Sequence, residues 1–177
     1  MEDTRNLMDE YKVMGNEDIV AALDAKRIPL EVAIENLGHD FNIGTIVRNA
    51  NAFNVARVHI LGRRKYNRRG AMVTDRYLHI DHFAEVTEFV ADARVRGMKI
   101  VAIENNRPEA RPLGQADLRA GCILVFGSES DGISEELLAL ADEVYYIEQI
   151  GSTRSMNVGC AAAVAMYEFA RQLNYLK

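Results

Sequence analysis

Short apolar runs alternate with longer helix-like segments along most of this chain. Runs rich in β-branched and aromatic residues predict strands over 30–36, 57–61, 98–105, 122–127 and 143–148. The segments between and after them predict helices over 43–54, 84–96, 134–141 and 156–174. Several of the strands carry apolar residues on both faces, so both of their faces must be covered. The pattern therefore predicts an α/β fold with an open parallel sheet and helices on both faces.

The first 28 residues have a different character. They read as one or two polar helices, the second opening at Asn16 as its N-cap, and Pro29 ends the segment. We expect residues 1–28 to form a helical appendage and residues 29–177 to form the main domain. The stretch 105–118 holds two prolines and a glycine and predicts a surface loop.

Composition narrows the class of protein. The chain has 177 residues, of which 49% are hydrophobic, which suits one globular domain and excludes a disordered or fibrous chain. No apolar run approaches the roughly 20 residues that span a bilayer, and residues 1–11 lack the apolar centre of a signal peptide. We therefore expect a cytoplasmic protein with no membrane partner.

Cysteine and histidine give no sign of a metal site. Cys122 and Cys160 lie in apolar segments, which predicts buried, reduced thiols. His79 and His82 are spaced like metal ligands, but no other ligand type converges on them in the sequence. We expect no bound metal.

Positive charge is concentrated in one segment. The net charge is −5, yet residues 63–69, "RRKYNRR", carry five cations and no anion, so the rest of the chain holds −10. Such a concentration is typical of phosphate binding, and a solvated loop or a nuclear-localisation peptide would be the alternatives. The candidate RNA-binding residues are Arg63, Arg64, Lys65, Arg68 and Arg69.

Ligands of open parallel sheets bind beyond the carboxyl ends of the strands, so we expect the functional residues in the loops that follow the strands. In the loop after the first strand, Asn42 can cap the helix that follows and could share a helix face with Arg48. A cation early in a helix is unfavourable against the helix dipole, which indicates an anionic partner or ligand for Arg48. An ordinary N-cap followed by a surface arginine is the alternative.

The loop after the fourth strand, 124–134, reads "LVFGSESDGIS". Glycines at 127 and 132 would let the backbone approach a ligand closely, and Glu129 is expected at the same sheet edge as Arg48. The loop lacks the GK[ST] ending of a nucleoside triphosphate site. A plain turn with a solvated glutamate remains the alternative.

The third loop leads into the last helix. Ser155 suits the N-cap of that helix and Asn157 its first turn, and capping alone is the simple interpretation. The small residues of "VGCAAAVA", 158–165, would allow another backbone to approach closely. That backbone could belong to the same chain or to a second subunit.

Taken together, the three loops resemble a known family. The order N-x-G-x-x-x-R at 42–48, V-F-G-S-E-x-x-G at 125–132 and G-x-x-x-S-M-N-V at 151–158 is similar to the SpoU/TrmH family of RNA 2′-O-ribose methyltransferases, within the SPOUT superfamily. The resemblance covers residues 30–175. It implies a C-terminal deep trefoil knot, which an ordinary fold would not contain.

The resemblance also implies a cofactor and its site. S-adenosyl-L-methionine would lie in the knot, held largely by backbone groups. The corresponding residues are Ile103, Glu104, Gly127, Ile147, Ile150, Ser155 and Met156.

For the reaction, the resemblance places Arg48 beside the attacking ribose oxygen. Asn42 and Glu129 would orient it, and Ser155 and Asn157 would complete the catalytic set. A guanidinium has a pKa above about 12, which favours a role for Arg48 as a fixed cation that stabilises the developing alkoxide over a role as the base. The two roles stay open at this point.

The family's enzymes act as homodimers with the active site at the interface. The face from Gly159 to Ala165 and the helix bearing Arg48 are the candidate contact surfaces, and segment 63–69 would position phosphates of tRNA or rRNA.

The chain departs from the family pattern at 147–149, "IEQ" in place of Ile-Pro-Met, at Gly159, where serine is common, and in having no separate N-terminal RNA-binding domain. The competing functions are a non-catalytic RNA-binding relative and a doubly wound small-molecule-binding domain.

Overall fold

The structure, a computed structural model, describes residues 7–37, 42–118 and 121–176. Its described strands form one sheet in the order β3-β2-β1-β6-β4-β7-β5, and each pairing within it is parallel. The strands are β1 (Ile28–Asn36), β2 (Val55–Gly62), β3 (Ile80–Phe83), β4 (Lys99–Ile103), β5 (Arg111–Pro112), β6 (Cys122–Phe126) and β7 (Glu143–Tyr146). The predicted α/β fold with a parallel sheet is confirmed.

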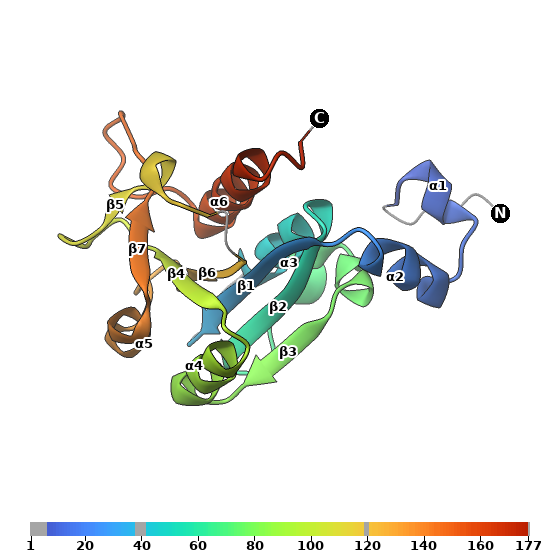
Figure 1. Cartoon of the computed structure of the whole chain (residues 1–177), viewed down its shortest axis with the longest axis horizontal. Helices are drawn as coiled ribbons and strands as arrows, with labels where there is room; N and C mark the ends of the chain where they lie inside the picture. The colour runs from blue at the N-terminus through green and yellow to red at the C-terminus, as the bar shows by residue number, and fades with distance from the viewer. Residues whose placement is uncertain (1–6, 38–41, 119–120, 177) are drawn as a thin grey trace.

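Helices lie on both faces of this sheet (Figure 1). Helices α3 and α6 cover one face, and α4 and α5 cover the other. The α-helices are α1 (Asp9–Lys12), α2 (Asn16–Asp24), α3 (Asn42–Ala52), α4 (Val86–Val95), α5 (Glu135–Leu140) and α6 (Val158–Gln172). Short 3-10 helices are η1 (Arg68–Ala71), η2 (Thr74–Tyr77) and η3 (Leu113–Gln115).

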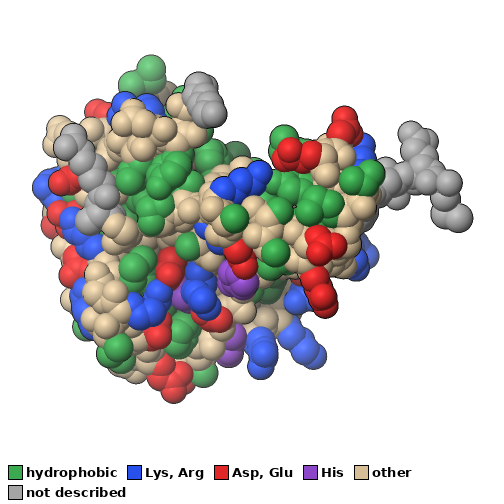
Figure 2. All heavy atoms as spheres, turned by 45° about the vertical axis from the view of Figure 1, so that its right-hand side comes forward, with side chains coloured by type: hydrophobic (Ala, Val, Ile, Leu, Met, Phe, Trp, Pro, Cys, Tyr) green, Lys and Arg blue, Asp and Glu red, His purple; other side chains and the backbone are tan. Residues whose placement is uncertain are grey.

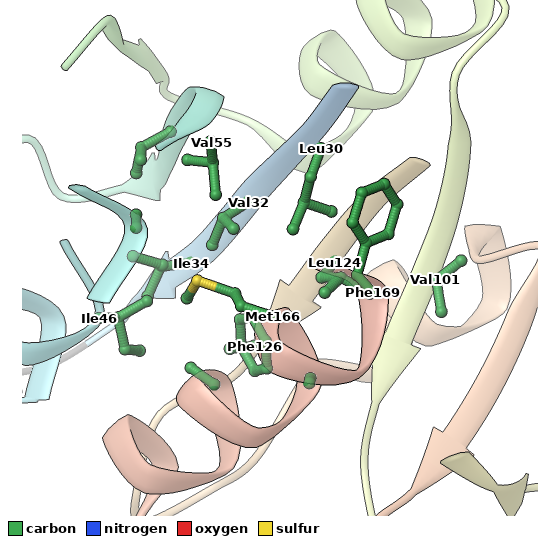
Figure 3. Close-up of a cluster of buried hydrophobic side chains, with 14 of the residues drawn as sticks. Leu30, Val32, Ile34, Ile46, Val55, Val101, Leu124, Phe126, Met166 and Phe169 are labelled. Carbon is green, nitrogen blue, oxygen red and sulfur yellow. The ribbon is translucent and has the colours of Figure 1, made fainter. Parts of the chain in front are cut away.

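The two faces of the central strand β1 enter two different cores. Leu30, Val32 and Ile34 point toward α3 and α6, where Met166 and Phe169 pack against them (Figure 3). The intervening Ala33 joins a second cluster with α4 and α5. Because successive side chains of a strand point to opposite faces, the apolar residues at neighbouring positions of β1 bury both of its faces.

The predicted strands and helices are all present, with no end shifted by more than two residues. β3, β5 and the 3-10 helices were not predicted from the sequence. β5 and η3 lie within 105–118, which was predicted to be only a loop. Pro29 lies inside β1, which begins at Ile28, rather than ending the preceding segment.

The N-terminal helices α1 and α2 project from one side of the main body (Figures 1 and 2). Tyr11 and Ile19 are buried with Tyr77 in a small separate cluster. Helix α2 begins at Asn16 with Gly15 as its N-cap, so the expected Asn16 cap is wrong by one position. Of the described helices, none has both the length and the apolar character needed to cross a membrane.

Candidate functional site

A cavity of about 600 Å³ opens at the carboxyl ends of β4, β6 and β7. The loops that follow these three strands form its walls, as expected for an open parallel sheet. The lining residues are Ile103, Glu104, Asn105, Asn106, Arg107, Gly127, Ser128, Glu129, Ser130, Asp131, Gly132, Ile133, Glu135, Tyr146, Ile147, Gln149, Arg154, Ser155, Met156, Val158 and Ala161.

The loop after β6 is a tight turn that only small residues allow. Ser128 and Gly132 exchange two backbone hydrogen bonds of 3.0 Å. A Cβ atom on Gly127 would overlap the backbone of Gly132, which itself has a φ of +70°. The turn therefore requires glycine at both positions.

Two carboxylates hold this turn from neighbouring strands. Glu104, just beyond β4, accepts a hydrogen bond from the backbone N–H of Ile133 at 3.1 Å. Glu35, on β1 and only 1% exposed, accepts bonds of 2.7 Å from both the N–H and the hydroxyl of Ser134. Glu35 was not predicted as a site residue, because it lies in a run whose pattern indicates only a strand.

At the edge of the cavity, three polar side chains from distant parts of the chain meet. Asn157 Nδ2 donates to Asn42 Oδ1 at 2.9 Å and to Glu129 Oε1 at 3.1 Å. Asn42 Nδ2 donates to the other oxygen of Glu129. We call Asn42, Glu129 and Asn157 the amide-carboxylate cluster. It joins the starts of α3 and α6 to the loop after β6.

Asn157 also caps the last helix. Its Oδ1 accepts a bond of 3.2 Å from the N–H of Cys160, and α6 begins at Val158. The expectations that Ser155 is the cap and that the helix starts near residue 156 are therefore wrong. Ser155 lies in the extended loop before the helix, where it lines the cavity instead.

Arg48 lies apart from the cavity within one chain. It is exposed on α3, it is not a lining residue, and within the described part of the chain its guanidinium has no hydrogen-bond or ion-pair partner. The anionic partner expected for it is therefore not found here.

Six of the seven predicted cofactor residues line the cavity, and Ile150 does not. Ile150 is fully exposed, because the chain between β7 and α6 carries it outward. The lining residues among the predicted set are Ile103, Glu104, Gly127, Ile147, Ser155 and Met156.

The cavity has an apolar wall and an ion pair at its mouth. Ile103, Ile147 and Val158 pack against the hydrophobic core behind it. At its mouth Arg107 pairs with Glu135, and this guanidinium lowers the pKa of the Glu135 carboxyl.

The basic segment, residues 63–69, lies between β2 and η1 with all five cationic side chains exposed. Arg68 is engaged within the chain: its Nε lies 3.3 Å from Asp75 Oδ2, and its guanidinium lies over the ring of Tyr66. The other four cations have no ion-pair partner among the described residues. These four are Arg63, Arg64, Lys65 and Arg69.

The remaining candidates have ordinary environments. His79 contacts Asp24 at 2.9 Å, and His82 contacts the carbonyl of Gly62 at 2.6 Å. Among residues 7–37, 42–118 and 121–176, no group of three His, Cys, Asp or Glu side chains could hold a metal ion. Cys122 is buried, which raises the pKa of its thiol to about 12. Cys160 is exposed on the first turn of α6, so the expectation of burial is wrong for it.

Comparison with known proteins identifies the family. The model of the SpoU rRNA Methylase family matches residues 29–167. The chain belongs to this family. The SpoU-family chain is 32% identical over 154 residues to the tRNA (guanosine(18)-2′-O)-methyltransferase of Escherichia coli K12, covering 84% of the chain and 66% of that relative. It thus spans just under two thirds of that protein's length.

Solved structures agree on the fold. The A. aeolicus TrmH/SpoU tRNA modifying enzyme superposes with a TM-score of 0.79 at 24% identity, over 90% of the SpoU-family chain and 83% of the enzyme. The SpoU methyltransferase AviRb from Streptomyces viridochromogenes, solved in complex with the cofactor AdoMet, gives 0.71 at 22% identity over 83% and 58%.

Proposed function

We propose that the chain methylates a ribose 2′-hydroxyl in tRNA or rRNA with S-adenosyl-L-methionine as methyl donor. The observation that carries this proposal is the amide-carboxylate cluster, drawn together from three separate loops beside a cavity of about 600 Å³. Family membership and the tRNA methyltransferase activity named for the E. coli relative support the same reaction.

The cavity suits this cofactor in size and chemistry. Its volume lies within the roughly 300–1,000 Å³ range of small-molecule sites. The apolar wall of Ile103, Ile147 and Val158 suits an adenine ring, and the carboxylate of Glu104 suits positively charged or hydroxyl groups. When bound, the cofactor supplies an electrophilic methyl group. Ile103, Glu104, Gly127, Ile147, Ser155 and Met156 would hold it.

The chain's own residues must position the ribose and manage its proton. Each carboxylate oxygen of Glu129 accepts a hydrogen bond from a side-chain amide, which fixes the orientation of Asn42 and Asn157. Fixed dipoles of this kind cost little reorganisation when charge develops on the attacking oxygen. Arg48 would add a permanent cation beside that oxygen, because its guanidinium stays charged at neutral pH.

We further propose that the chain after β7 forms the family's trefoil knot. Strand β6 lies between β1 and β4, whereas β7 lies beyond β4, so the chain must return across the sheet to place α6 against α3. The connecting loop contacts two earlier loops, through Asn157 to Glu129 and through the carbonyl of Arg154 to Asn105.

The active form is proposed to be a homodimer whose interface completes the site. In one chain Arg48 stands outside the cavity, so Arg48 of the partner subunit would supply the cation. The small residues Gly159, Ala162 and Ala165 are buried within the chain, which leaves Val164 and Tyr167, 40% and 52% exposed, as the outward face of α6.

The basic segment would bind RNA phosphates. Replacing its four unpaired cations by glutamine should weaken RNA binding and reduce the slope of log affinity against log salt by about 3, since each phosphate contact contributes roughly 0.7 to 0.9. Arg68→Gln is the matched control, with a smaller effect because Arg68 is already paired with Asp75. Filter binding over a salt series measures both, and an unchanged slope would assign the segment to solubility.

Transfer of a radiolabelled methyl group from the cofactor to total RNA tests the function. Label should enter a 2′-O-methylated nucleoside, identified by nuclease digestion and chromatography. Cofactor binding without transfer to any RNA would favour a non-catalytic RNA-binding protein. No cofactor binding by calorimetry would end the proposal.

A further inference from the structure

We propose that Asn36 and Gly70 are positioning residues that fix the basic segment to β1 and to α3, the helix carrying Arg48, so that binding an RNA phosphate also sets where the target ribose lies. The inference rests on the proposed function and deepens it. It treats the segment as a rigid part of the site and not as a free tether.

The start of the segment is tied to the end of β1. Asn36 is 1% exposed, and its Nδ2 donates to the carbonyl of Arg63 and, at 3.1 Å, to that of Lys65. The N–H of Arg63 donates to the carbonyl of Asn36 at 3.1 Å. Backbone polar groups need partners, and the Asn36 side chain supplies them for two carbonyls of this turn. Gly62 makes the turn possible with a φ of +84°.

The far end of the segment touches helix α3 backbone to backbone. A Cβ atom on Gly44 would lie 2.7 Å from the carbonyl oxygen of Asn67 and 2.9 Å from the nitrogen of Ala71. A Cβ atom on Gly70 would lie 3.0 Å from the nitrogen of Thr45. Two glycines from separate elements therefore face each other with no side chain between them.

The middle of the segment is also held. Tyr66 is partly buried and packs against the main core, and Asn67 Oδ1 accepts a bond of 3.0 Å from the N–H of Arg69 at the start of η1. Anchored at three places, the segment presents its cations at fixed positions. Arg48 lies one helical turn after Gly44, so those positions are set relative to Arg48 itself.

Gly70→Ala tests this coupling. The methyl group forces η1 away from α3 and moves the cations without removing any. The cofactor affinity should stay within about twofold and the RNA salt slope should stay unchanged. The kcat for methyl transfer should fall about tenfold or more, because small misplacements of bound substrate are costly. Gly114→Ala is the control, since its Cβ meets nothing within 4 Å.

Asn36→Ala provides a second disruption at the other anchor and should lower kcat in the same way. If Gly70→Ala lowers the thermal unfolding midpoint by more than a few degrees, the kcat of Asn36→Ala is the measurement that tests the coupling. A kcat equal to that of Gly114→Ala in both variants, or a raised KM at unchanged kcat, would overturn the coupling. If instead the variant lacking the four unpaired cations binds RNA normally, the RNA role of the segment fails first, which is a distinct result.

Discussion

Asn157 makes contacts of two kinds that can be separated experimentally. Its side-chain oxygen caps α6 through the N–H of Cys160, while its amide nitrogen donates to Asn42 and Glu129. The oxygen serves the stability of the helix. The nitrogen serves the cluster at the cavity, because only a donor can sit between two acceptors.

Asn157→Asp should therefore lose activity and keep most of its stability. Aspartate is as good an N-cap as asparagine, so the free energy of unfolding should change by no more than about 1 kcal/mol. The new carboxylate oxygen would face Glu129 Oε1, now 3.1 Å from the amide nitrogen, and methyl transfer should fall at least about a hundredfold.

Urea unfolding and the methyl-transfer assay measure the two effects. Asn157→Ser is the matched variant, because serine keeps the cap and removes the amide without adding charge. Transfer by the aspartate variant at the parent rate would show that the cluster is only structural.

For single residues, the sequence predicted those site residues whose type and position in a loop were informative. It did not predict residues whose hydrogen-bond partner lies far away in the chain. Glu129 and Asn157 could be selected because small polar residues follow apolar strands at one sheet edge. Glu35 and Asn36 could not be selected, because a strand pattern does not reveal their hydrogen bonds with Ser134 and Arg63. The helix cap was misplaced because Ser155 and Asn157 are both good caps.

Among the elements, β1, β2 and the end of α4 are joined by a buried ionic network. Glu31 of β1 contacts His59 Nε2 at 2.7 Å and Arg96 Nη1 at 2.6 Å. Burial opposes ionisation of Glu31, but the hydrogen bonds from His59 and Arg96 outweigh it and lower the pKa of the carboxyl to about 2. The ionised carboxylate therefore stabilises the packing of α4 on the sheet.

This network should make the free energy of unfolding depend on pH. A carboxyl whose pKa is lower in the folded state stabilises the fold above its unfolded pKa of 4.5, and this contribution is lost as pH falls toward 2. The loss attributable to Glu31 should be about 3 kcal/mol. Urea unfolding at pH 6, 4 and 2.5 should show a flatter dependence for Glu31→Gln than for the parent chain, and equal slopes would contradict the assignment.

The sequence predicted the long, apolar elements well and the short, polar ones poorly. β3 reads "IDHF" and is partly exposed at a sheet edge, so its pattern carries little hydrophobic signal. η1 and η2 depend on contacts with α3 and on left-handed residues at Met72 and Val73, which no local rule anticipates. The proposed knot does not follow from any hydrophobic pattern, and only the family resemblance suggested it.

At the level of the whole molecule, the position of Arg48 favours a site shared between two chains. Arg48 and the cavity lie apart in one chain, while exposed Val164 and Tyr167 give α6 an outward apolar face. A shared site predicts that two inactive variants can rescue each other.

Arg48→Ala and Glu129→Gln should each lack activity, and mixing them after joint refolding should restore about a quarter of the parent rate. Half of the dimers would then pair one chain of each kind, and one of the two sites in each such dimer would be intact. Refolding either variant with itself is the control. An inactive mixture that sediments as a dimer would place Arg48 in the same chain as its cluster.

The bond between Asn157 and Asn42 joins residues 115 positions apart, and Asn157 is synthesised after all the described strands of the sheet. The ribosome must therefore pass residue 157 before the amide-carboxylate cluster can form. A chain terminated before that residue would lack both the Asn157 amide and α6, whose Met166 and Phe169 pack against β1, so we expect an inert fragment and not a weakened enzyme.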